Sequence, residues 1–111
     1  MTLETLQHKT LTYLAPLKKY LQQEYQDRLK QVMLFGSQAR GEATSASDID
    51  ILIVLKDPVD ISLELQHTSH FVAQFCLEHN LLVSRFFLPC SRFETENSPF
   101  LRNIRREGIV L

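Results

Sequence analysis

The chain has 111 residues, of which 44% are hydrophobic and 23% are charged, and its formal net charge at pH 7 is −1. This length fits a single domain over residues 1–111, and the composition is that of a globular chain with a buried core, which excludes disordered and collagen-like proteins. The near-neutral charge argues against a protein that coats nucleic acid, so no direct nucleic-acid binding is expected. The longest uncharged apolar run, Ile51–Leu55, is too short to span a membrane.

The N-terminus and the cysteines predict a cellular compartment. Residues 1–9 contain Glu4 and no apolar stretch, which argues against a secretory signal. The only two cysteines, Cys76 and Cys90, do not make the disulfide framework of a small secreted domain. We therefore expect both thiols to be reduced and the protein to be cytoplasmic.

The first half of the chain predicts one long helix and two strands. Leucines from Leu3 to Leu21 recur mostly every three or four residues, as on the buried face of a helix, and Pro16 falls inside that pattern, where a proline can kink a helix or split it in two. The short apolar run Val32–Phe35 predicts a buried strand. A turn into a short helix over residues 37–41 and a loop over residues 43–47 should follow. The apolar run Ile49–Leu55 predicts the second strand.

The second half continues the alternation of helices and strands. The expected elements are a helix capped by Asp60 and ending near His79, a strand over Leu81–Leu88, a helix capped by Ser98 and ending at Gly108, and a short strand over Ile109–Leu111. The whole order predicts an α/β domain with a small mixed β-sheet of three to four strands and flanking helices. The long helix between the second and third strands suggests a crossover connection.

Two aspartates, Asp48 and Asp50, stand at the start of the second predicted strand. Residues two apart on a strand point to the same face, so the two backbones should lie about 7 Å apart with both carboxylates on one side of the sheet. Carboxylates this close repel each other, and one becomes hard to ionise unless a cation is present. Mg²⁺ prefers oxygen ligands and shares carboxylates with substrate phosphates. Taken alone, such a pair is more typical of two surface aspartates that cap the loop before a strand.

Gly36 and Ser37 stand between a strand and the short predicted helix. A glycine at a strand end lets the backbone turn sharply and lets a phosphate approach. Backbone N–H groups at the helix start, together with the Ser37 hydroxyl, can hold phosphate oxygens. Arg40 lies one helical turn further on and either neutralises phosphate charge or pairs with Glu42. The segment is not a Walker loop, because it lacks the lysine and has too few glycines.

Together these residues resemble the nucleotidyltransferase superfamily of the DNA polymerase β type. The family pattern is an apolar strand, Gly-Ser, a spacer and Asp-x-Asp on the next strand, and here ten residues separate Gly36-Ser37 from Asp48-Ile49-Asp50. The longer segment GSQARGEATSASDIDILI is similar to the minimal nucleotidyltransferase subgroup, and FLRNIRREGIVL looks like the usual end of those short proteins. The resemblance covers nearly the whole chain and implies the polymerase β-like fold.

The resemblance implies Mg²⁺-dependent transfer of a nucleotide from ATP. Asp48 and Asp50 would be the catalytic residues and would hold two metal ions. Gly36, Ser37 and Arg40 would hold the triphosphate. An acceptor hydroxyl would attack the α-phosphorus and release pyrophosphate, and positioning together with charge neutralisation would supply most of the rate.

The chain departs from the family pattern at one place. Complete members carry a third carboxylate on the following strand, and the strand predicted over Leu81–Leu88 contains no Asp or Glu. Ser84 or Arg85 stands at the expected position. Three explanations stay open: two acids suffice, Glu78 or a residue of a partner replaces the third acid, or the domain only binds its partner.

The small size of the chain narrows the implied substrate. Relatives that act on aminoglycosides or on poly(A) carry an extra domain, for which 111 residues leave no room. The short subgroup implies an antitoxin that transfers AMP to a tyrosine of an all-helical HEPN ribonuclease toxin and so silences it. Two alternatives stay open: an antitoxin that neutralises the toxin by contact alone, and a small-molecule nucleotidyltransferase that works with a separate acceptor subunit.

The remaining candidate residues have simpler interpretations. His67 and His70 lie three apart on a predicted helix, but no third metal ligand is visible. The basic residues of the last third are expected to pair with nearby glutamates, with phosphate or partner binding as the alternative; they are Arg85, Arg92, Arg102, Arg105 and Arg106. Phe86, Phe87 and Phe100 are expected in the core, although one of them could line an adenine pocket.

Overall fold

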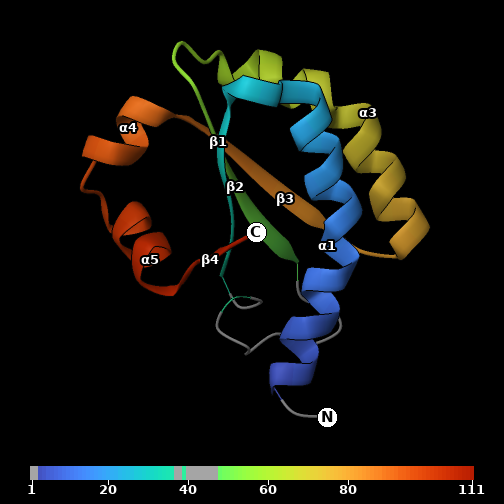
Figure 1. The fold of residues 1–111 in the computed structure, drawn as a ribbon. Helices are drawn as coiled ribbons and strands as arrows, with labels where there is room; N and C mark the ends of the chain where they lie inside the picture. The colour runs from blue at the N-terminus through green and yellow to red at the C-terminus, as the bar shows by residue number, and fades with distance from the viewer. Residues whose placement is uncertain (1–2, 37–38, 40–47) are drawn as a thin grey trace.

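The computed structural model describes residues 3–36, 39 and 48–111 (Figure 1). The elements in chain order are α1 (Leu3–Tyr25), the 3-10 turn η1 (Gln26–Arg28), β1 (Leu29–Phe35), β2 (Ile49–Leu55), α3 (Ile61–His79), β3 (Val83–Pro89), α4 (Cys90–Thr95), α5 (Pro99–Glu107) and β4 (Ile109–Val110). The predicted α/β class, with a small mixed sheet and flanking helices, is confirmed.

The described strands form one sheet in the order β3-β2-β1-β4. β1 is antiparallel to both of its neighbours, and β2 is parallel to β3. Because α3 connects the two parallel strands, it is the crossover connection that the sequence suggested. β2 therefore lies inside the sheet, and it begins at the end of the sheet where β1 finishes.

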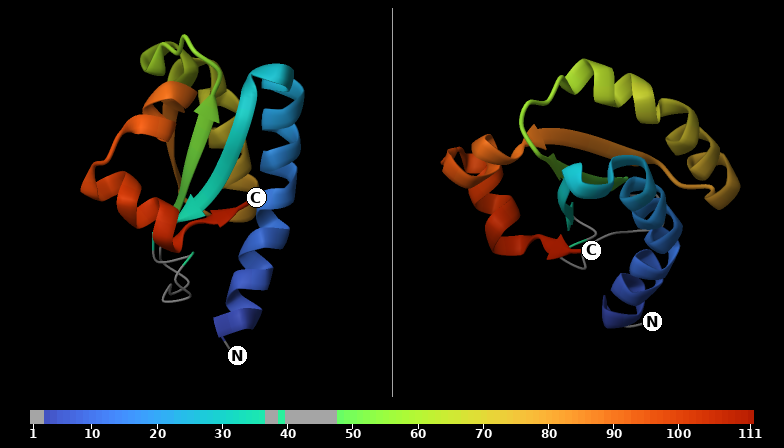
Figure 2. Two further views of the ribbon diagram at one scale, coloured as in Figure 1. Left: turned by 60° about the vertical axis from the view of Figure 1, so that its left-hand side comes forward. Right: turned by 45° about the horizontal axis from the view of Figure 1, so that its top comes forward.

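Helices cover both faces of the sheet (Figure 2). Alternate residues of β2 point to opposite faces, so one strand serves two separate cores. On one face, Ile49, Ile51, Ile53 and Leu55 pack with the α1 leucines Leu14, Leu17 and Leu21 and with Val72 and Phe75 of α3. On the other face, Leu52 and Val54 pack with Leu88, Leu101 and Ile104, beneath α4 and α5.

The helix ends follow the predicted capping residues. The Asp60 side chain accepts a hydrogen bond from the backbone N–H of Leu63 at 3.2 Å, and α3 ends at His79. The Ser98 hydroxyl accepts from the N–H of Leu101 at 3.2 Å, with Pro99 as the first residue of α5. These side chains satisfy N–H groups that have no partner within the helix.

The structure differs from the sequence predictions at several element boundaries. Pro16 lies inside α1, which continues as one helix to Tyr25 rather than splitting in two, and the buried leucines hold it against the sheet. β1 begins at Leu29, before the apolar run, because Leu29 and Gln31 pair with the end of β2. The short helix α4, which begins at Cys90, was not among the predicted elements. None of the helices in the described part of the chain is long and apolar enough to cross a membrane.

Candidate functional site

Asp50 lies at the end of the sheet where β1 ends and β2 begins. Its register partners are Phe35 on β1 and Ser84 on β3. Because Asp50 alternates with Ile49 and Ile51, its side chain belongs to the face that α4 and α5 cover. Asp48 directly precedes the strand and is exposed. The structure thus places one carboxylate half-buried within the sheet and the other in solvent beside it.

Gly36 ends β1 in a conformation that only glycine adopts readily. Its φ angle is +75°, in the left-handed region, where L side chains are strained. A Cβ atom at this position would lie 2.5 Å from the Oδ2 atom of Asp50. The absence of a side chain at Gly36 therefore lets the backbone turn directly against the carboxylate, which agrees with the sharp turn expected from the sequence.

Two causes raise the pKa of Asp50 above its ordinary value. The first is burial, which disfavours the charged form, and the second is the negative charge of Asp48. The sequence predicted the repulsion between the two carboxylates but not the larger contribution of burial. A cation beside Asp50 would relieve both effects, so the donor atoms and the electrostatics fit a hard divalent metal.

The register of the sheet decides between the two residues expected at the position of the third acid. Ser84 pairs with Asp50. Arg85 points to the opposite face, where its Nε donates to the Thr68 hydroxyl at 2.8 Å and its guanidinium donates to the Leu65 carbonyl oxygen at 2.7 Å. Ser84 therefore occupies the place beside the carboxylate, and Arg85 fastens α3 to β3.

Glu78 does not approach Asp50 in the described structure. It lies on α3, which packs on the opposite face of the sheet, and its side chain accepts a hydrogen bond from Gln74 at 2.9 Å. The described residues contain no group of three or more His, Cys, Asp or Glu side chains that could hold a metal ion. The two aspartates are thus an incomplete metal site by themselves, and further ligands would come from phosphates and water.

Ser37 and Arg40, which the sequence assigned to the triphosphate, lie outside the described residues. Between them, Ala39 is helical and buried, with 6% of its surface exposed. The predicted short helix after Gly36 thus has one described residue, and the phosphate-binding roles of Gly36, Ser37 and Arg40 stay predictions.

An aromatic cluster stands beside Asp50 on the same face of the sheet. The rings of Phe35, Phe86 and Phe100 contact one another, with centroid distances of 5.5–5.8 Å. Phe86 and Phe100 are each 41% exposed, so the expectation that they are core residues was wrong, whereas Phe87 is buried as expected. Phe86 lies on β3, an edge strand of the described sheet, and Phe100 is the second residue of α5.

A pocket of about 160 Å³ adjoins Gly36 and the aromatic cluster. Phe35, Gly36 and Phe100 line it together with Asn103 and Glu107 of α5. The sequence did not identify Asn103 and Glu107 as site residues, because the pattern of a polar helix does not show which of its turns lies over the end of a strand. Arg106 donates to the side-chain oxygens of both, at 3.0 Å and 3.3 Å, and so holds their side chains in place.

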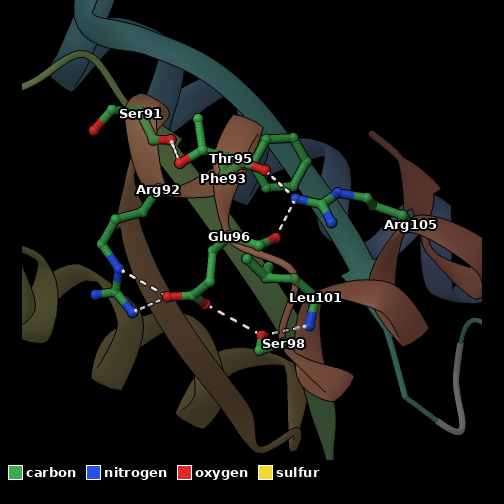
Figure 3. A network of polar contacts seen from close by, with 8 residues as sticks. All are labelled: Ser91, Arg92, Phe93, Thr95, Glu96, Ser98, Leu101 and Arg105. Atoms are coloured by element: carbon green, nitrogen blue, oxygen red, sulfur yellow. Dashed lines mark hydrogen bonds and ion pairs between the residues drawn. The ribbon is translucent and has the colours of Figure 1, made fainter.

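The basic residues of the last third are largely engaged in structural contacts (Figure 3). Arg92 donates two hydrogen bonds to Glu96, and Ser98 donates to the other carboxylate oxygen of Glu96. Arg105 donates to the carbonyl oxygens of Phe93 and Glu96. These contacts join α4 to α5 and support the simpler interpretation of the arginines, in which they stabilise the fold.

The two histidines also have a structural interpretation. His67 lies 3.0 Å from a carboxylate oxygen of Glu24 on α1. Neither His67 nor His70 belongs to a metal-binding cluster within the described residues. Both cysteines are free thiols, as expected.

Comparison with known proteins places these features in a family context. Residues 14–110 match the family model of the nucleotidyltransferase domain. A candidate protein adenylyltransferase of Methanocaldococcus jannaschii, MJ0604, is 35% identical over 92 residues, which cover 82% of this chain and 86% of the relative. A second candidate protein adenylyltransferase of that organism, MJ0141, is 29% identical over 92 residues, covering 83% and 88% of the two chains.

Solved structures show the same fold. A candidate nucleotidyltransferase from Sulfolobus solfataricus superimposes with a TM-score of 0.69 at 20% identity, over 99% of this chain and 86% of that chain. A toxin–antitoxin structure with AMP-PNP superimposes with a TM-score of 0.57 at 16% identity, over 94% of this chain and 70% of that chain. At these identities the likeness concerns the fold alone.

Proposed function

This chain belongs to the nucleotidyltransferase domain family, and from that premise we propose that it is an antitoxin that transfers AMP from ATP to a tyrosine of a HEPN ribonuclease toxin. Membership of the family makes it a nucleotidyltransferase with a nucleotide substrate. The name of the relative MJ0604 supports a protein acceptor, and the toxin–antitoxin structure supports a toxin partner. A cytoplasmic location is part of this proposal, because the proposed reaction consumes ATP.

One observation carries the proposal: a glycine turn lies against a carboxylate whose charge is unfavourable without a cation. Asp50 has a raised pKa because of its burial and the charge of Asp48, and the Gly36 backbone approaches Asp50 so closely that a Cβ there would lie 2.5 Å from Oδ2. In the proposed site, Asp48 and Asp50 hold Mg²⁺, with two ions expected, while Gly36, Ser37 and Arg40 bind the triphosphate. The metal, when bound, neutralises phosphate charge and orients the reacting groups.

The proposed reaction is a substitution at the α-phosphorus of ATP. The phenolic oxygen of the acceptor tyrosine forms a bond to phosphorus, the bond to the bridging oxygen breaks, and pyrophosphate leaves. The phenolic proton passes to solvent. The protein contributes chiefly by positioning: the turn at Gly36 fixes the phosphates against Asp50, which is held by its place between Phe35 and Ser84.

The experiment is intact-mass analysis of the HEPN toxin after incubation with this chain, ATP and Mg²⁺. We expect the toxin to gain AMP, and we expect the gain to disappear with the Asp48→Asn/Asp50→Asn double variant. A toxin whose acceptor tyrosine is replaced by Phe is the matched control for the site of modification. A toxin that stays unmodified in every mixture would refute the transfer.

A second candidate function is favoured by the residue beside Asp50. Ser84 stands in register with Asp50 where complete relatives carry a carboxylate, and a serine cannot take up the acceptor proton as a carboxylate does. Under this alternative the chain neutralises its toxin by contact alone. The same double variant separates the two functions, because it keeps neutralising the toxin only if contact suffices.

A further inference from the structure

Strand β3 forms an outer edge of the sheet, and one side of its backbone is open. β2 is its only strand neighbour in the described part of the chain. The N–H of Ile49 donates to the Leu82 carbonyl oxygen at 2.8 Å, and successive residues of a strand direct their backbone groups to opposite sides. The outward groups are therefore those of Val83, Arg85 and Phe87. Within the described residues they have no backbone partner.

A groove of about 380 Å³ lies along this open edge. Ile61 and Leu65 of α3 line one side, and Phe86 and Phe100 line the other. Three of these side chains are well exposed: 36% for Ile61 and 41% for each of the two phenylalanines. An open strand edge within an apolar groove is the arrangement by which proteins bind extended peptides, since the strand supplies hydrogen bonds and the groove receives side chains.

One wall of the groove is held rigidly. α5, which carries Phe100, is joined to α4 through Glu96, whose carboxylate accepts from Arg92 and Ser98 (Figure 3). On the opposite side, Arg85 fastens α3 to β3 through Thr68 and Leu65. A groove with fixed walls loses little conformational entropy on binding.

The open edge leads directly to the candidate site. Ser84 of β3 is the register partner of Asp50, so a strand added to β3 would lie two spacings from Asp50, roughly 10 Å between backbones. A serine or threonine hydroxyl lies only two bonds from its own Cα atom and falls short of Asp50. A tyrosine hydroxyl stands at the far end of a ring and covers the distance.

We propose that a non-helical segment of the protein substrate, a loop or a terminus, binds along β3 in an extended conformation as an additional strand and that a tyrosine of this segment reaches Asp50 across Ser84. Its ring packs against Phe86 and Phe100, and its hydroxyl points to the carboxylate. This inference rests on the proposed function and adds to it how the acceptor is held and why it is a tyrosine. The small size of Ser84 leaves room for the ring beside Asp50.

The direct test is amide hydrogen exchange by NMR on the full chain, free and in complex with the HEPN toxin and AMP-PNP. We expect the amides of Val83, Arg85 and Phe87 to exchange at least about tenfold more slowly in the complex, because they gain hydrogen bonds. The amides of Ser84 and Phe86 face β2 in both states and are the internal control.

A matched pair of variants on α3 tests the groove. Ile61→Gln removes an apolar side chain from the groove, and Leu77→Gln changes an exposed leucine of the same helix, 79% exposed, that does not line the groove. We expect Ile61→Gln to raise the KM for the toxin about tenfold with the affinity for ATP unchanged. Leu77→Gln should leave both values unchanged.

The outcomes separate this inference from the proposed function. AMP transfer at the normal rate without protection of the three outward amides would overturn strand addition and leave the function intact. An equal KM for the two α3 variants would overturn it in the same way. If the toxin neither binds nor gains AMP, both proposals fail together.

Discussion

Burial and the charge of Asp48 both raise the pKa of Asp50, and the sign of this shift predicts a pH-dependent stability. A carboxyl group whose pKa is raised in the folded state binds its proton more tightly there than in the unfolded chain. Its ionised form therefore destabilises the metal-free protein at neutral pH, and the effect is relieved as the pH falls through the raised pKa. Below the ordinary aspartate pKa the group contributes nothing.

The corresponding prediction is that Asp50→Asn makes the metal-free protein more stable at pH 7, by a few degrees in Tm, while abolishing transfer. The difference from the wild type should shrink as the pH is lowered. Thermal unfolding in EDTA between pH 3 and pH 7 measures it. Asp27→Asn, at an exposed acidic residue of η1, is the control and should show no such gain. A loss of stability at pH 7 would contradict the assignment of an unfavourable charge.

Gly36→Ala tests the contact between the turn and the carboxylate. The added Cβ would lie 2.5 Å from Asp50 Oδ2 in a left-handed conformation, so we expect a loss of about 1–2 kcal/mol in the free energy of unfolding and weaker Mn²⁺ binding, measured by EPR. Gly108→Ala is the matched control. Its Cβ would lie 2.5 Å from the Ile104 carbonyl oxygen, away from Asp50. It should destabilise the fold without changing Mn²⁺ affinity, and equal effects on Mn²⁺ would contradict the prediction.

At the scale of single residues, the sequence predicted the candidate site residues that can be identified from local spacing. Gly36 and Asp50 follow from a strand end and a strand start, and the structure brings them together. Whether Ser84 or Arg85 lies beside Asp50 depends on how β3 is aligned with β2. A sequence does not show this alignment, because it is set by packing on two faces at once.

At the scale of elements, a buried carboxylate joins α1 to α3. Glu64 is 5% exposed, and it accepts hydrogen bonds from the Tyr25 hydroxyl at 3.0 Å and from Arg28 at 3.2 Å. Burial raises the pKa of Tyr25 most, and the hydrogen bond between Tyr25 and Glu64 raises it further. A helical pattern of apolar residues does not reveal the buried polar residues Glu64 and Thr68, because their partners Tyr25, Arg28 and Arg85 lie far away in the sequence.

The contacts of Glu64 predict that two substitutions at this position lower the free energy of unfolding by different amounts. Glu64→Gln keeps an acceptor for Tyr25 and loses the ion pair with Arg28, which is partly exposed, so we expect a loss of about 1 kcal/mol. Glu64→Ala leaves the Tyr25 hydroxyl buried without a partner and should lose about 2–3 kcal/mol. Urea unfolding measures both. The reverse order would show that the charge, rather than the buried hydrogen bond, stabilises this contact.

Most elements were predictable because local signals mark them. β2 has the predicted bounds, Ile49–Leu55, and the caps Asp60 and Ser98 start their helices as expected. α4 was not predicted, because its six residues carry no apolar periodicity. Its first turn is held by Asp57, which accepts from the N–H and the hydroxyl of Ser91, and Arg105 of α5 donates to the Phe93 carbonyl oxygen. The start of β1 was missed for a similar reason: Leu29 and Gln31 extend the strand by pairing with β2 rather than by their own pattern.

At the scale of the whole molecule, one sheet separates a larger core from a smaller one. The larger core lies under α1 and α3, and the smaller one lies under α4 and α5, on the face that carries Asp50. The layers are visible in Figure 2. Damage to either core should lower stability. The smaller core packs against Phe35, which adjoins Gly36, whereas the larger core holds Ala39 and Ile49.

Leu17→Ala and Leu101→Ala test whether the two cores differ in their effect on the candidate site. Both leucines are buried, 2% and 0% exposed, on opposite faces of the sheet, so each substitution should lower the free energy of unfolding by about 2–5 kcal/mol. Leu101→Ala should also raise the KM for ATP at a temperature where both variants are folded, because α5 positions Phe100 and the pocket beside Gly36. Leu17→Ala should raise that KM less, since α1 packs on the face of the sheet opposite Asp50 and Phe100. Calorimetry and steady-state kinetics on the same preparations provide the two measurements. An equal change in KM for both variants would mean that the sheet transmits core damage uniformly and that α5 has no special part in positioning the site.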